Sequence, residues 1–245
     1  MNKKAFIVAV FLLAIAGAAV FLLQSDSDES VETVERGGVS VQSEENPEPT
    51  PPPPQTETAT YIVRFNNTWS AETHPNTFLS SAHMSPLVAV SHSMQGDVFS
   101  SGSLATDGVE EMAETGATGI LESELNSNSN VHSFAKGSRI DSPGSSEVTL
   151  EFTQQNSLLT FVSMIAPSPD WFVGVESYDL FDGGVWADSL ELRLNNYDAG
   201  TDSGVDFTSA NADTNPAENI QGQSDEAFRA AVDEADFGTL TIIRQ

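Results

Sequence analysis

Residues 158–175 read LLTFVSMIAPSPDWFVGV, two apolar runs joined by a short Pro-Ser-Pro-Asp turn. The runs 158–166 and 171–175 are short and rich in β-branched and aromatic residues, which is typical of buried β-strands. Proline fixes φ and removes a backbone donor, so Pro167 and Pro169 should end the first strand. The stretch therefore predicts two consecutive core strands with an acidic residue, Asp170, at their turn.

Similar apolar runs elsewhere in the chain predict a whole domain of short strands. Further runs of similar composition predict strands at 61–65, 147–152, 190–194 and 239–244. Apolar residues recur at helical spacing in two segments, and these predict short helices at 108–116 and 224–236. Many short strands without alternating βαβ units predict an all-β fold, an antiparallel β-sandwich over residues 61–245. Long polar segments are expected to decorate it as loops, for example 121–146 and 205–224.

The charge of the chain limits the classes of partner that it can bind. Its 245 residues include 36 acidic and 9 basic side chains, which gives a net charge of −27. No nucleic acid is expected as a partner, because a polyanion needs clusters of Lys and Arg, and the same holds for an anionic membrane surface. Bound cations and a simply solvated acidic surface both remain open. The absence of cysteine excludes disulfides, thiol nucleophiles and cysteine-type zinc sites.

The beginning of the chain predicts export. Residues 1–23 start with Lys3 and Lys4 and continue as an apolar run, which fits a signal peptide or a signal anchor. The run is about long enough to span a bilayer, and we favour a single N-terminal membrane anchor over a cleaved signal. Residues 24–60 are acidic, rich in proline and free of aromatic residues, so we expect a disordered linker. The domain should therefore be extracytoplasmic, either secreted or tethered.

Acidic residues follow the ends of two predicted strands. Asp170 follows the first run, while Asp198 and Asp202 lie in YDAGTDSG, after the strand at 190–194. Calcium takes about six to eight oxygen ligands, largely carboxylates and carbonyls. Three carboxylates that converge without a cation repel one another, so their convergence would call for a metal. Because the spacing is not that of an EF-hand, both a calcium site and ordinary solvated turns remain open.

These residues also carry a family resemblance. APSPDWFVGVESYDL at 166–180 and YDAGTDSGVDFTSAN at 197–211 resemble the signature blocks of the spondin domain family of extracellular matrix proteins. Residues 61–92 and 102–116 resemble the opening of the same domain. The resemblance implies a β-sandwich similar to calcium-dependent lipid-binding domains, with a bound Ca²⁺. Its metal-binding residues fall on Asp170, Asp198, Asp202 and, on the preceding strand, Glu151.

The resemblance also implies a function. Family members act in adhesion and recognition, so the chain is expected to be a non-catalytic calcium-binding module. Its partner would be a cell-surface or matrix glycan or protein, and the domain is expected to be monomeric. A structural envelope or matrix component and a calcium-dependent hydrolase are the alternatives. Family members from animals carry cysteines where this chain has Phe181, so the cysteine-free sequence resembles an exported bacterial relative.

Histidine and serine residues offer weaker candidates for chemistry. His74, His83 and His92 recur every nine residues, which matches no metal-ligand spacing, so we expect them to form hydrogen bonds within the fold. Ser85 lies near His83, but it lacks the G-x-S-x-G pattern and precedes Pro86, which indicates a turn rather than a nucleophile. The three tryptophans are expected to fill the core: Trp69, Trp171 and Trp186.

Overall fold

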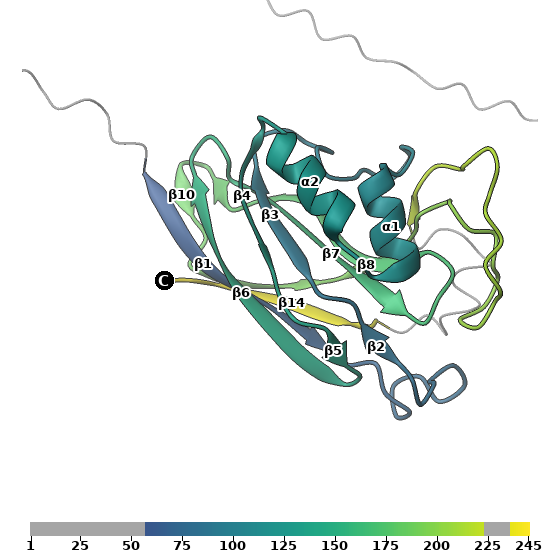
Figure 1. Ribbon diagram of the computed structural model, residues 1–245. Coiled ribbons are helices and arrows are strands. Elements are labelled where there is room, and N and C mark those ends of the chain that lie inside the picture. The colour runs from purple at the N-terminus through teal and green to yellow at the C-terminus, as the bar shows by residue number, and fades with distance from the viewer. Residues whose placement is uncertain (1–56, 223–235) are drawn as a thin grey trace, which may run out of the picture. The chain divides into compact units, whose positions relative to one another are not determined.

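The computed structural model describes residues 57–222 and 236–245. This part of the chain forms two antiparallel sheets packed face to face, with two helices on the outer face of the larger sheet (Figure 1). The prediction of an antiparallel β-sandwich with short helices is confirmed. The predicted signal or anchor, nearly all of the predicted linker and the predicted helix at 224–236 lie outside the described residues, apart from Asp236. Neither described helix is long and apolar enough to cross a membrane.

The smaller sheet has four strands in the order β11–β14–β1–β6. Their bounds are Thr58–Asn67 for β1, Gly144–Thr153 for β6, Ser189–Arg193 for β11 and Gly238–Arg244 for β14. Strand β1 alternates as a half-buried strand should: Tyr61, Val63 and Phe65 are buried, whereas Arg64 is exposed. The last strand, β14, lies between β1 and β11, so the C-terminal residues complete the sheet that the first strand begins.

The larger sheet has the order β13–β12–β8–β7–β2–β5, and β3 joins it by pairing with both β7 and β4. The bounds are His83–Met84 for β2, Val88–His92 for β3, Val131–Lys136 for β4, Ile140–Asp141 for β5, Leu158–Ala166 for β7, Trp171–Asp179 for β8, Asn195–Asp198 for β12 and Gln221–Gly222 for β13. Every residue of β7 is buried, because one face meets the other sheet and the opposite face meets the helices. That position explains the continuous apolar run in the sequence.

Two apolar layers hold the domain together. The first lies between the sheets and includes the three tryptophans, all buried as predicted. The second lies between the larger sheet and the helices α1, Asp107–Thr115, and α2, Gly119–Ser127 (Figure 1). Helix α1 confirms the predicted helix, and it buries Val109, Met112 and Ala113. A small hairpin of β9, Phe181–Asp182, and β10, Val185–Trp186, pairs with neither sheet, although Trp186 packs into the core between them.

The prediction of a loop at residues 121–146 is wrong. These residues form most of α2 together with β4, β5 and the start of β6. Leu121 and Leu125 lie four residues apart and are both buried, which is the spacing of one helix face. The surrounding Ser and Asn residues concealed this signal.

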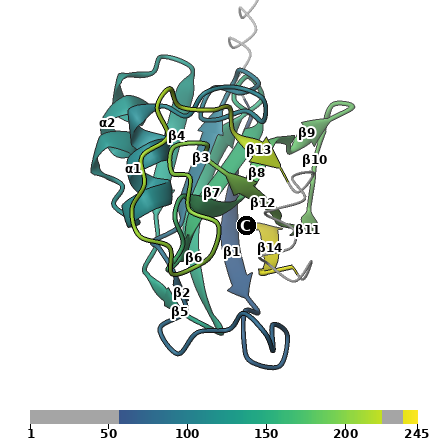
Figure 2. The ribbon, with the colours of Figure 1, turned by 90° about the vertical axis from the view of Figure 1, so that its right-hand side faces the viewer.

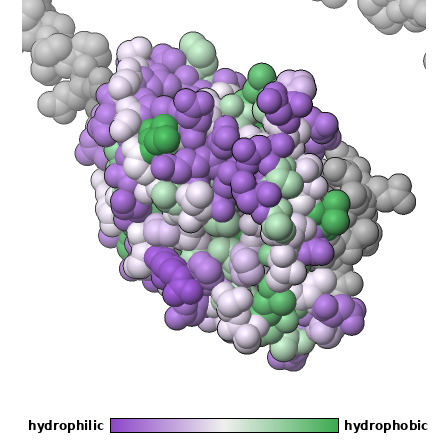
Figure 3. Space-filling view, turned by 45° about the vertical axis from the view of Figure 1, so that its right-hand side comes forward, coloured by the Kyte–Doolittle hydropathy of each residue, from purple (hydrophilic) through white to green (hydrophobic). Residues whose placement is uncertain are grey.

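The face in Figure 3 is mostly hydrophilic, with apolar side chains scattered over it, in keeping with the acidic composition.

Candidate metal site

Strand pairing brings the three predicted aspartates to one end of the sandwich. Asp170 ends the turn between β7 and β8, and Trp171 follows it as the first residue of β8. Asp198, at the end of β12, pairs with Trp171 and so lies beside Asp170. The chain then turns back after β12, so that the backbone N–H of Asp202 donates to Oδ2 of Asp170 at 3.1 Å. Residues far apart in the sequence therefore form a single acidic cluster, which we call the aspartate cluster: Asp170, Asp198 and Asp202.

Asp170 lies at the centre of this cluster and is fully buried. Its Oδ2 accepts hydrogen bonds from the backbone N–H of Thr201 at 2.8 Å and from that of Asp202. Its Oδ1 is also buried and has no hydrogen-bond partner. Burial, followed by the negative charge of Asp198, raises the pKa of Asp170 to about 7. The two backbone hydrogen bonds lower the pKa, but they do not offset these effects.

The other two aspartates shape their own loop. Asp198 accepts hydrogen bonds from the Gly200 N–H at 2.9 Å and from the indole Nε1 of Trp171 at 3.1 Å. Asp202 accepts from the Gly204 N–H at 2.7 Å and from the Ala212 N–H at 2.9 Å. An ionised carboxylate offers about four lone-pair sites. These contacts therefore orient the two carboxylates and are compatible with further bonds to a cation.

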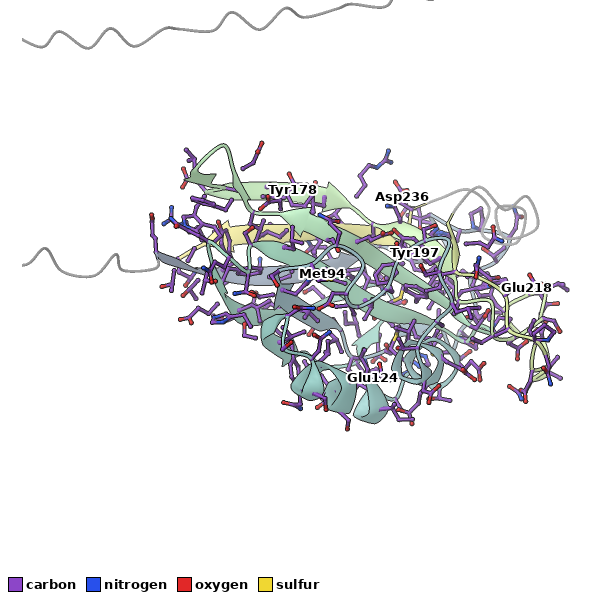
Figure 4. The ribbon with its side chains drawn as sticks, turned by 90° about the horizontal axis from the view of Figure 1, so that it is seen from above. Met94, Glu124, Tyr178, Tyr197, Glu218 and Asp236 are labelled. Carbon is purple, nitrogen blue, oxygen red and sulfur yellow. The ribbon has the colours of Figure 1, made fainter. Side chains whose placement is uncertain are left out.

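Two glycines allow the loop to close over the turn. Gly200 has φ +76°, and a Cβ atom there would collide with the backbone carbonyl of Glu218. At Gly204 a Cβ atom would lie 2.6 Å from the ring of Pro169. Figure 4 shows Glu218 on this loop, beyond the end of the sheet that carries Tyr197. Glycine is required at both positions because the backbone makes close contacts there.

Helix α1 adds a carboxylate that the sequence reading missed. Glu114 lies in the last turn of α1, and its pKa is raised mainly by burial and further by the charges of Glu110, Asp202 and Asp213. Thr201 acts in the opposite direction and lowers the pKa. No spacing in the sequence connects Glu114 with residues almost ninety positions later, since only the packing of α1 on the sheet brings them together.

Comparison with known proteins identifies the domain. A family model described as Spondin_N matches residues 59–230. The chain belongs to the spondin N-terminal domain family. Spondin-2 of Homo sapiens is 35% identical over 170 residues, which cover 66% of this chain and 51% of that protein. Spondin-1 of Gallus gallus is 33% identical over 177 residues, which cover 67% of this chain and 22% of that protein. The chain thus spans about half the length of the first relative and about a fifth of the second.

The structure of the spondin domain corrects the expectation for Glu151. Its side chain is 55% exposed on the outer face of β6, where its Oε1 lies 3.2 Å from Nε2 of His132. Glu151 lies beside the turn that leads into β7, whereas Asp170 follows the other end of that strand. The nine residues of β7 span about 30 Å at roughly 3.3 Å per residue. Glu151 is therefore not part of the aspartate cluster.

The donor set of the spondin domain can be tested against calcium. Among the residues that the structure describes, no three His, Asp or Glu side chains lie close enough, as they stand, to hold a metal ion. The chemistry of the site nevertheless fits a hard cation. Its donors are carboxylates, they come from tight loops, and Oδ1 of Asp170 is buried with no hydrogen-bond partner. Asp170, Asp198 and Asp202 are the residues that would hold the ion.

The histidine and serine candidates have roles within the fold. His92 is buried, with Nδ1 2.9 Å from the Met94 carbonyl and Nε2 2.8 Å from the Thr160 hydroxyl. Ser85 accepts a hydrogen bond from the Met164 N–H at 2.8 Å, which ties β2 to β7. The prediction that the histidines form hydrogen bonds within the fold is confirmed for His92.

Proposed function

We propose that this spondin domain is a calcium-binding, non-catalytic recognition or adhesion module that acts outside the cytoplasm. Membership of the spondin family supports an adhesive role. The excess of acidic side chains supports a cation as a partner, because it attracts positive charge and repels polyanions. The hydrogen bonds of Ser85 and His92 within the fold support a role without catalysis.

One observation carries the calcium proposal. Asp170 is fully buried, one of its carboxylate oxygens has no hydrogen-bond partner, and the charges of Asp198 and Asp202 act on it. Burying an uncompensated carboxylate is unfavourable by several kcal/mol, so such a group either takes up a proton or binds a cation. A divalent ion bound by the three aspartates would remove this penalty.

Calcium would act on recognition by ordering the end of the sandwich. The β7–β8 turn and the loop that follows β12 meet at Asp170, which accepts the bonds from Thr201 and Asp202, and at Pro169, against which Gly204 lies closely. An ion held between these segments would fix them in one arrangement before a partner binds. Preorganised loops lose less conformational entropy on binding, which increases affinity. The proposed partner is a glycan or protein of a cell surface or matrix.

Arrays of glycans and matrix proteins test this function directly. The full chain would be applied in calcium and in chelator, beside the variant Asp202→Ala. The proposal expects selective binding in calcium, which is lost in chelator and in the variant. Binding that is the same in all three conditions would contradict a role for calcium, and turnover of a bound glycan would contradict the non-catalytic assignment.

Export is a separate part of the proposal, because residues 1–23 lie outside the described residues. Cell fractionation of the full chain, followed by a wash at high pH, distinguishes a secreted chain from a tethered one. We expect the chain outside the cytoplasm and resistant to the wash, as the length of the apolar run favours an anchor. Recovery in the cytoplasm would overturn this part.

A further inference from the structure

Strand β11 forms an uncovered edge of the smaller sheet. Figure 2 shows β14 between β1 and β11, and no described strand pairs with β11 on its other side. The edge strands β6 and β4 lie against each other, since the Ser133 hydroxyl of β4 donates to the Glu151 carbonyl of β6 at 2.8 Å. The end strands β13 and β5 of the larger sheet are only two residues long. Among the described strands, β11 is therefore the free edge that is long enough to pair with another strand.

The hydrogen bonds at the two ends of β11 show which backbone groups face this edge. The Arg244 N–H donates to the Asp188 carbonyl at 2.9 Å, and the Leu194 N–H donates to the Gly238 carbonyl at 3.5 Å. The register between β11 and β14 runs without a shift, and alternate residues of an antiparallel strand bond to the same neighbour. Three residues of β11 therefore direct their N–H and C=O groups away from β14: Ser189, Glu191 and Arg193.

The side chains of β11 divide between the core and the solvent. Leu190 and Leu192 are partly buried and pack against the core between the sheets, whereas the three alternate residues are exposed. The Arg193 side chain is 83% exposed. Glu191 and Arg193 lie two residues apart and so share the outer face of the sheet. The edge thus presents unpaired backbone groups beside one acidic and one basic side chain, which is the arrangement that accepts a further strand.

The charges on this edge are complementary to a second copy of the same edge. Two β11 strands related by a two-fold axis run antiparallel, and with the axis at Leu192 each Glu191 lies directly opposite Arg193 of the other copy. With the axis at Glu191, two carboxylates would face each other. With the axis at Leu190, Glu191 would face Ser189. Opposite charges directly across a strand pair stabilise it and like charges destabilise it, so the axis at Leu192 is favoured.

Two features of the chain affect the strength of this pairing. Arg193 already forms an ion pair with Asp236 of its own chain, but a guanidinium has five N–H donors and can bind a second carboxylate. The net charge of −27 opposes association of any two copies. At about 0.15 M salt, charges more than roughly 8 Å apart are largely screened, so the general repulsion falls while directly opposed side chains still interact.

We propose that two copies of the chain associate through β11, in antiparallel register with the two-fold axis at Leu192, so that two four-stranded sheets become one continuous sheet. The inference departs from the expectation of a monomeric domain. It does not rest on the proposed calcium binding, because β11 contains no member of the aspartate cluster. Pairing along one short edge buries little surface, so the dimer is reversible. A dimer presents any recognition surface twice, which raises its avidity for a repetitive ligand.

Cysteine cross-linking tests the register, since the chain has no cysteine of its own. Glu191→Cys and Arg193→Cys are prepared separately as full chains in a mild detergent, then mixed and oxidised. In the proposed register the two thiols face each other with Cα atoms about 5.5 Å apart, within the range of a disulfide. In either variant alone the thiols are diagonal neighbours about 7–8 Å apart, beyond that range. We expect the mixture to cross-link at least about fivefold faster than either variant alone.

Two results of the cross-linking experiment would overturn the proposal. One is a mixture that cross-links no faster than the single variants, or not at all. The other is preferential cross-linking of Glu191→Cys with itself, because this would place the axis at Glu191. The cross-link is expected in calcium and in chelator alike, so a failure of the proposed calcium binding would leave this result unchanged.

Charge reversal tests the ion pairs without a cross-link. Glu191→Arg places two arginines opposite each other, and we expect the dissociation constant of the dimer, measured by sedimentation in the same detergent, to rise about tenfold. Adding Arg193→Glu restores opposite charges and should return this constant to within about twofold of the wild type. Glu72→Arg is the matched control, because it changes the net charge equally at an exposed residue between β1 and β2. Equal effects of Glu191→Arg and Glu72→Arg would overturn the proposal.

Discussion

The core between the two sheets and the acidic end of the same sandwich are stabilised in opposite ways. In the core, Phe65 and Phe161 are fully buried and pack edge to face with ring centroids 5.3 Å apart. At the acidic end, Asp170 is just as deeply buried, but one of its oxygens has no hydrogen-bond partner. The core is complete once the chain has folded, whereas the acidic end retains a buried carboxylate oxygen that the described residues leave without a hydrogen bond.

The largest effect is expected in the core. Phe161→Ala should lower the free energy of unfolding by about 3–5 kcal/mol, through lost burial and the cavity left behind. The loss should be equal in calcium and in chelator, because Phe161 lies away from the cluster in the centre of β7. Urea denaturation measures it, with Val185→Ala as the control, since that side chain is 70% exposed. A loss that depends on calcium would mean that the two regions are not independent.

A change of pH should alter the free energy of unfolding through the acidic end almost as strongly as the core substitution does. The folded state raises the pKa of Asp170 from 3.8 to about 7, so the folded state binds more protons than the unfolded one between these values. Without calcium, the stabilisation by this group is therefore present below about pH 4 and is lost as pH rises to about 7. At about 1.4 kcal/mol per pKa unit the loss is on the order of 4 kcal/mol.

The variant Asp170→Asn isolates this effect. In chelator it should be more stable than the wild type near neutral pH and similar to it near pH 4, as followed by urea denaturation. His92 contributes in the opposite direction, because burial lowers its pKa and its stabilisation is lost as pH falls below 6.5. The difference between variant and wild type cancels that contribution. Equal stability of the two proteins at neutral pH would show that Asp170 carries no such penalty.

Calcium itself should stabilise the acidic end by a smaller amount. A ligand that binds the folded state alone contributes about 2.7 kcal/mol at 100 times its dissociation constant. Scanning calorimetry should show a higher melting temperature in calcium than in chelator, and Asp202→Ala should remove most of this gain. An unchanged melting temperature in chelator would refute the calcium site.

The smallest effect is expected at Glu151. Because this residue lies on β6, far from the turn that carries Asp170, Glu151→Gln should change calcium affinity by less than about twofold. Calorimetric titration beside Asp202→Ala checks this. A large loss of calcium affinity in Glu151→Gln would show that Glu151 contributes to the calcium site, and the acidic end would then extend beyond the aspartate cluster.

Local patterns predicted most of the sandwich. The runs that became β1, β6, β7, β8, β11 and β14 were all recognisable, because each buries a continuous or alternating apolar face. Among the elements that were missed, α2 has polar residues between its two buried leucines, and β4 has no fully buried residue. Strand β3 is buried throughout but only five residues long, and its pairing with β4 and β7 stabilises it more than its own composition does.

The sequence by itself determined the fold class, the family and the three aspartates, since alternation, turn residues and the signature blocks are properties of short stretches of chain. Only the tertiary structure decided which acids meet. It excluded Glu151, which faces outward from the other sheet, and it brought in Glu114 from a helix that packs across β7 and β8. The physical reason is that electrostatic neighbours are set by distance in space, and strand pairing and helix docking fix those distances between residues far apart along the chain.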